Sequence, residues 1–72
     1  MQWIQFDART VRLVEAAQRE YLNDLEQAGF RPPVEAWVAR TAPHGKHEWS
    51  VNAGFVQYLA ERAVPFAVLQ AR

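Results

Sequence analysis

The stretch VEAWVARTAPHGKHEWSV, residues 34–51, decides the fold that we expect for this chain. Apolar and polar side chains alternate on both sides of a segment, residues 42–46, that contains a proline and a glycine. Alternation at period two is typical of half-buried strands, and a Pro- and Gly-containing segment between two such runs favours an antiparallel hairpin. We therefore expect strands at residues 34–41 and 47–51, joined by the loop between them.

The alternation also assigns the hairpin side chains to the two faces of the sheet, because successive side chains of a strand point in opposite directions. In the second strand we expect Trp49 and Val51 to face the core, and Glu48 and Ser50 to face away from it. In the first strand the expected inward residues are Val34, Ala36 and Val38, and the expected outward residues are Glu35, Trp37 and Ala39.

A helix is predicted before the hairpin. Apolar residues recur at three- and four-residue spacing across residues 14–28, which is the pattern of a helix with one buried face. Asp7 or Thr10 can cap its N-terminus. Gly29 can adopt the left-handed conformation that commonly ends a helix, and the pair Pro32–Pro33 then prevents the helix from continuing.

A second helix is predicted after the hairpin, with Asn52 as its N-cap and its end at about Ala63. Pro65 ends it, because a proline disfavours the helical conformation in the residue before it. Short alternating runs at residues 2–6 and 66–70 predict two further strands. Their expected inward residues are Ile4, Phe6, Phe66 and Val68, and their expected outward residues are Trp3, Gln5, Ala67 and Leu69.

The expected element order is strand, helix, strand, strand, helix, strand, within one domain over residues 1–72. With right-handed crossovers this order predicts an α+β plait, in which a four-stranded antiparallel sheet of spatial order 4-1-3-2 carries both helices on one face. The arrangement resembles the ferredoxin-like superfold in element order and length, without a shared motif, so it implies no active residues. The expected core consists of Ile4, Phe6, Val14, Tyr21, Leu25, Val38, Trp49, Val51, Phe55, Leu59, Phe66 and Val68.

The composition narrows the classes of function. Eight basic residues balance eight acidic ones among 72, so the chain lacks the basic excess of a typical nucleic-acid-binding module. There is no cysteine, which excludes disulfides and thiolate metal sites. The N-terminal residues lack the basic and apolar segments of a signal peptide, and no stretch has the length and hydrophobicity of a membrane span. We expect a cytoplasmic protein that does not bind membranes.

The sheet face without helices is the predicted contact surface. The expected faces place two tryptophans there, about 10 Å apart with a small serine between them, as the walls of a shallow groove. Apolar patches bordered by charges often mark contact sites. Recognition of RNA by such a face needs basic surroundings and stacking rings on both central strands, which this sequence does not offer. The predicted partner-binding residues are Trp3, Gln5, Trp37, Ser50 and Leu69.

Motifs for catalysis or metal binding are weak. His44 and His47 are close in sequence, but two imidazoles are fewer than the three or four protein ligands that a zinc site normally uses. Ser50 and His47 match no nucleophile motif, and there is no glycine-rich phosphate loop. We therefore predict no catalytic residues, no cofactor and no metal.

Three classes of function remain, in order of preference. The first is a non-catalytic interaction module that forms a homodimer or docks a heterologous protein partner through its open sheet face. Such a contact would also support the small core of a chain this short. The second is a small-molecule-sensing regulatory domain of the plait type, with its ligand at an edge or at a dimer seam. The third is a small dimeric plait enzyme.

Overall fold

Six main helices and strands follow one another in the predicted order in the computed structural model, which describes residues 1–31 and 36–69. They are β1 (Gln2–Asp7), α1 (Val11–Gln27), β2 (Val38–Ala42), β3 (Lys46–Val51), α2 (Ala53–Glu61) and β4 (Ala67–Leu69), with a short 3-10 helix, η1 (Ala8–Thr10), before α1. The predicted βαββαβ order is confirmed. Within the described ranges, no helix is long and apolar enough to cross a membrane.

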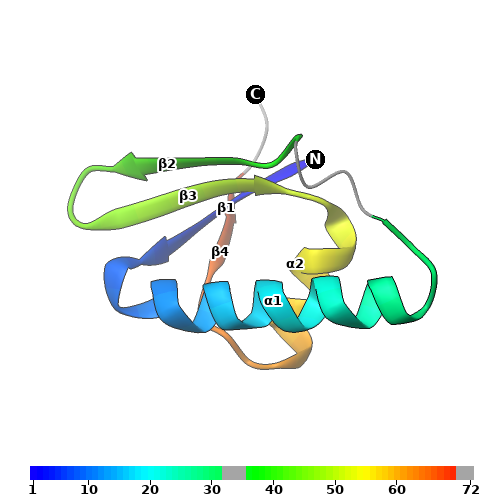
Figure 1. The fold of residues 1–72 in the computed structure, drawn as a ribbon. Helices are drawn as coiled ribbons and strands as arrows, with labels where there is room; N and C mark the ends of the chain where they lie inside the picture. The colour runs from blue at the N-terminus through cyan, green and yellow to red at the C-terminus, as the bar shows by residue number, and fades with distance from the viewer. Residues whose placement is uncertain (32–35, 70–72) are drawn as a thin grey trace.

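The strands form one antiparallel sheet of four strands in the order β2-β3-β1-β4. Counted from the opposite edge, this is the order 4-1-3-2, so the predicted topology is confirmed. Figure 1 shows α1 and α2 on the same side of the sheet. The other side carries no helix from the described parts of the chain, and we call it the helix-free face.

The cross-strand register fixes which side chains share a face, because residues directly opposite one another in an antiparallel pair point the same way. Ile4 is fully buried and lies opposite Trp49, so both face the helices. Trp3 lies opposite Ser50 on β3 and opposite Leu69 on β4, on the helix-free face. The faces predicted for β1, β3 and β4 are thus confirmed.

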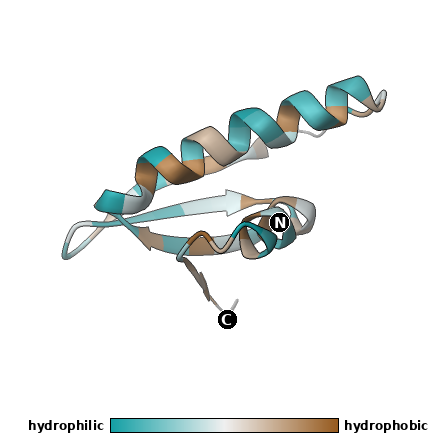
Figure 2. Cartoon of the chain, turned by 90° about the horizontal axis from the view of Figure 1, so that it is seen from below, coloured by the Kyte–Doolittle hydropathy of each residue, from teal (hydrophilic) through white to brown (hydrophobic). Residues whose placement is uncertain are grey.

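The core lies between the sheet and the helices, and Figure 2 shows hydrophobic and hydrophilic residues interleaved along the long helix α1. Its buried hydrophobic residues are Ile4 and Phe6 of β1, Val14, Ala17 and Tyr21 of α1, Val51 of β3, and Phe55 and Leu59 of α2. Leu25, Trp49 and Phe66 pack against this core and stay partly exposed. Two predicted members, Val38 and Val68, are half exposed instead. Val68 does face the helices, opposite Ile4, but it belongs to the short edge strand β4, which is open on one flank.

The prediction for β2 is wrong in both its start and its faces. The strand begins at Val38, and the predicted orientations of Val34 and Glu35 concern residues outside the described part of the chain. Val38 lies opposite Ser50 and therefore on the helix-free face. Ala39 points to the helix side, which is the reverse of the prediction.

Trp37 accounts for this reversal. It was predicted on the open face, but it lies just before β2 and packs against Phe55, with the two ring centroids 5.0 Å apart. A tryptophan can bury about 150–250 Å² of mostly apolar surface, far more than a valine or an alanine. Burying Trp37 therefore stabilises the fold more than burying Val38 would. Ala36, which was also predicted to face inward, is exposed.

Both helices end in the same hydrogen-bonded turn, but only one of them ends at a glycine. After α1, the N–H groups of Gly29 and Phe30 donate to the carbonyl oxygens of Glu26 and Leu25 at 3.0 and 2.8 Å. Gly29 has φ +84°, as its predicted role requires. After α2, Ala63 occupies the equivalent position with φ +55°. That conformation costs an L-residue with a side chain about 1–2 kcal/mol.

None of the predicted N-cap side chains makes a capping hydrogen bond. Thr10 and Asn52 occupy the N-cap positions of α1 and α2, but neither side chain bonds to its helix N-terminus. Nδ2 of Asn52 donates instead to the hydroxyl of Tyr21 at 3.0 Å, which ties α2 to α1. Asp7 ends β1, and its carboxylate binds Lys46 of β3.

Candidate functional site

The helix-free face is organised in three rows that cross the strands. Each row joins residues that lie opposite one another in the cross-strand register. The apolar row consists of Val38, Ser50, Trp3 and Leu69. The polar row consists of Arg40, Glu48, Gln5 and Ala67. The charged row consists of Ala42, Lys46 and Asp7.

The apolar row presents hydrophobic side chains across the full width of the sheet. Trp3 and Leu69 are half-buried, and Val38 is half exposed at the outer edge. Ser50 sits between Trp3 and Val38 and is only 8% exposed, because its larger neighbours cover its short side chain. This row is the part of the face where apolar surface meets water.

The structure places four of the five predicted partner-binding residues on this face, namely Trp3, Gln5, Ser50 and Leu69. Trp37, the fifth, lies against Phe55 on the helix side. The predicted groove between two tryptophans therefore does not form, and Val38 occupies the position in the row that was expected for Trp37.

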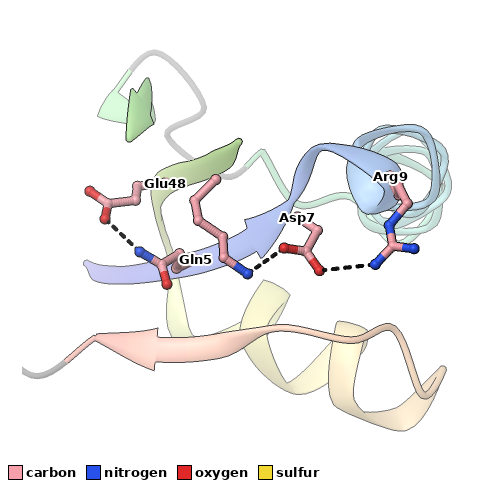
Figure 3. Close-up of polar contacts among 5 residues, drawn as sticks. Gln5, Asp7, Arg9 and Glu48 are labelled. Carbon is pink, nitrogen blue, oxygen red and sulfur yellow. Dashed lines mark hydrogen bonds and ion pairs between the residues drawn. The ribbon is translucent and has the colours of Figure 1, made fainter. Parts of the chain in front are cut away.

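Arg40 connects the apolar row to the polar row, and the prediction did not include it. Its guanidinium carbon lies 3.9 Å from the ring centroid of Trp3, and its Nε donates to Oε1 of Glu48 at 2.7 Å. Nε2 of Gln5 donates to the other carboxylate oxygen of Glu48 at 3.0 Å (Figure 3). The bond from Arg40, followed by that from Gln5, lowers the pKa of Glu48 below its usual range.

The charged row carries a second ion pair. Nζ of Lys46 donates to Oδ1 of Asp7, and the guanidinium of Arg9 lies 3.9 Å from Oδ2 (Figure 3). The hydrogen bond from Lys46 is the main cause that lowers the pKa of Asp7. Both carboxylates of the three rows, those of Glu48 and Asp7, are thus ionised at neutral pH. Each lies beside a cationic side chain of its own row. Among the residues of the three rows, the charges cancel.

The histidines and the serine considered as catalytic or metal-binding groups are not brought together. His47 faces the helices and stacks on Phe6, with ring centroids 6.0 Å apart, whereas Ser50 lies on the opposite face of β3. His44 is exposed in the hairpin loop. Among residues 1–31 and 36–69, no group of three or more His, Cys, Asp or Glu side chains could hold a metal ion.

A cleft of about 320 Å³ lies on the other side of the sheet, between α1 and the edge strand β2. It is lined by Glu15, Gln18, Trp37, Val38, Ala39 and Trp49. The indole nitrogen of Trp37 is buried and has no hydrogen-bond partner in the described part of the chain. The sequence offered no signal for this cleft, because its walls come from a helix and a strand far apart along the chain.

No family model, curated protein or solved structure matches this chain.

Proposed function

We propose that this protein is a non-catalytic interaction module and that the helix-free face is its contact surface. The observation that carries the proposal is the apolar row, in which Trp3, Leu69 and Val38 present hydrophobic surface across the sheet beside a row of paired charges. A flat apolar strip bordered by polar groups is the usual composition of a protein contact. Tryptophan and arginine, here in contact with each other, are the side chains that most often dominate binding energy.

The partner that fits this face is a second copy of the chain. Because Arg40 pairs with Glu48 and Lys46 pairs with Asp7, two copies meet without net repulsion. A nucleic acid would instead meet two carboxylates, and the described residues of the three rows offer it no basic excess, which disfavours it. A two-fold contact places the apolar row of each copy against the same row of the other, so that Trp3 buries its exposed edge against its equivalent.

The size of the face sets the strength of such a contact. Four strands about 4.8 Å apart and three rows about 6.8 Å apart give roughly 400 Å² per copy, or about 800 Å² for the pair. Stable protein interfaces bury about 1,200–2,000 Å² in total. We therefore expect a weak dimer that exchanges with monomer in the micromolar range or above, which suits a transient interaction.

Sedimentation equilibrium over a wide concentration series tests the proposal. The wild type should show a reversible monomer–dimer equilibrium, and Trp3→Glu should shift it to monomer. The new carboxylate lies next to Arg40, so the variant should keep the circular dichroism spectrum of the wild type. Val38→Glu, at a half-exposed position of the same row, provides a second disrupting variant.

Leu13→Glu is the matched control, because Leu13 is a large hydrophobic residue, 55% exposed, on α1 and thus on the helix side. It should dimerise as the wild type does. A wild type that stays monomeric at the highest soluble concentration, or a dimer that Leu13→Glu disrupts and Trp3→Glu does not, would refute self-association through this face.

A further inference from the structure

The cleft between α1 and β2 shares Val38 with the apolar row, and its other lining residues do not belong to the contact surface. Glu15 and Gln18 of α1 form one wall, and Trp37, Val38 and Ala39 form the wall at the sheet edge, with Trp49 of β3 also lining the cavity. Its volume of about 320 Å³ is at the lower end of the range for small-molecule sites, which is about 300–1,000 Å³. The cleft, which is open to solvent, can therefore receive a compact molecule.

Both indole rings that line the cleft are held in place by aromatic residues of the core. Trp37 packs on Phe55 at a centroid distance of 5.0 Å, and Trp49 packs edge to face on Phe6 at 5.5 Å. Such support limits the rotation of the rings, so little conformational freedom is lost when a ligand binds against them. The aromatic part of the cleft is thus formed before any ligand arrives.

The electrostatic character of the lining favours a positive charge. The faces of indole rings are electron-rich and attract cations, tryptophan being the most effective aromatic residue in this respect. Glu15 adds a carboxylate, Gln18 adds an amide, and none of the described residues that line the cleft is basic. Arg12 and Arg19 lie one turn away from Glu15 on α1 and could pair with its carboxylate. Such an exposed ion pair within a helix is weak, so its competition would reduce the affinity for a cationic ligand only about twofold.

We propose that this cleft binds a small organic cation, in which a quaternary or alkylated ammonium group lies against Trp37 and Trp49 and is neutralised by Glu15. The inference does not depend on the proposed contact function, because Trp37, Ala39 and Trp49 lie on the helix side of the sheet and, of the lining residues, only Val38 is shared with the apolar row. A neutral molecule of the same shape gains the apolar contact but not the attraction to the rings and the carboxylate. The site should therefore distinguish the two by charge.

Heteronuclear NMR of the indole N–H groups gives a direct test, since the chain has three tryptophans and the third, Trp3, faces the other side of the sheet. Choline is the probe, and its uncharged carbon analogue is the reference ligand. Choline should shift the signals of Trp37 and Trp49 and leave that of Trp3 in place. Its affinity should exceed that of the analogue by about threefold or more.

Two variants on α1 separate the role of the carboxylate from general electrostatics. Glu15→Gln removes the charge with little change in shape and should weaken choline binding about threefold. Glu26→Gln is the matched control, because Glu26 is exposed on the same helix about 16 Å further along and does not line the cleft. Its affinity for choline should be that of the wild type.

Three results would each overturn the proposal. They are an absence of shifts at Trp37 and Trp49 up to molar choline, equal affinities for choline and the carbon analogue, and an equal loss of affinity in both glutamate variants. A fourth result would also overturn it: a short lysine-containing peptide that binds more tightly than choline would identify a protein side chain as the ligand in place of a small molecule.

Discussion

Gly54 provides the sharpest test of how the two helices pack. It lies in the first turn of α2, and a Cβ atom at this position would lie 2.6 Å from the hydroxyl oxygen of Tyr21. That oxygen has little room to move. Tyr21 is 9% exposed, its ring packs on Phe55 and Tyr58 at centroid distances of 5.4 and 5.1 Å, and its hydroxyl accepts a hydrogen bond from Asn52.

The expected effect of Gly54→Ala is the difference between two opposing terms. Replacing a helical glycine by alanine normally stabilises by up to about 1 kcal/mol. Forcing an extra methyl group into a packed site costs about 1–3 kcal/mol. We therefore expect a net loss of roughly 1–2 kcal/mol in the free energy of unfolding. In a Tyr21→Phe background the nearest ring atom, Cζ, is 3.7 Å away, so the same substitution should be neutral or stabilising.

Urea denaturation of the wild type, the two single variants and the double variant measures this coupling. We expect an interaction energy of about 1–3 kcal/mol that favours the double variant. Single effects that add within about 0.5 kcal/mol, or a Gly54→Ala variant that is more stable than the wild type, would contradict this contact between Gly54 and Tyr21.

Two further predictions concern Ala63 and the ion pairs of the helix-free face. Ala63→Gly should raise the free energy of unfolding by about 1 kcal/mol, because glycine adopts the positive φ of this position without strain; a decrease measured in urea would contradict this. The lowered pKa values of Glu48 and Asp7 stabilise the fold above their usual values of 4.5 and 3.8, and this stabilisation is lost as the pH falls through the folded-state pKa. Glu48→Gln should therefore flatten the acid dependence of stability, and an unchanged profile would contradict the role assigned to its carboxylate.

Most of the fold could be predicted because local patterns and tertiary packing agree there. The apolar stripe of α1 through Val14 and Tyr21 and the alternation around Ile4 each allow one arrangement that buries the apolar side chains. Gly29 ends α1 in the left-handed conformation that glycine favours. The topology then follows from the element order and the handedness of crossovers. The N-cap of α2 was placed correctly at Asn52, but its bond to Tyr21 could not be foreseen, because it depends on how two helices approach each other.

The faces of β2 could have been derived from the register of the hairpin. The turn comprises residues 43–45, so Ala42 pairs with Lys46, and two steps further Arg40 must lie opposite Glu48. Opposite charges across an antiparallel pair favour that register. This register was not evident from the turn sequence, because His44 adopts φ +64°, a conformation that is rare for residues other than glycine.

The observed faces of β2 differ from the predicted ones by a shift of one residue. This shift moves Trp37 from the helix-free face to the helix side, where it lines the cleft. It also brings Arg40 onto Trp3. Both candidate sites therefore depend on how a three-residue turn closes. The sequence pattern of β2 alone could not decide this, because alternation at period two fits either face equally well.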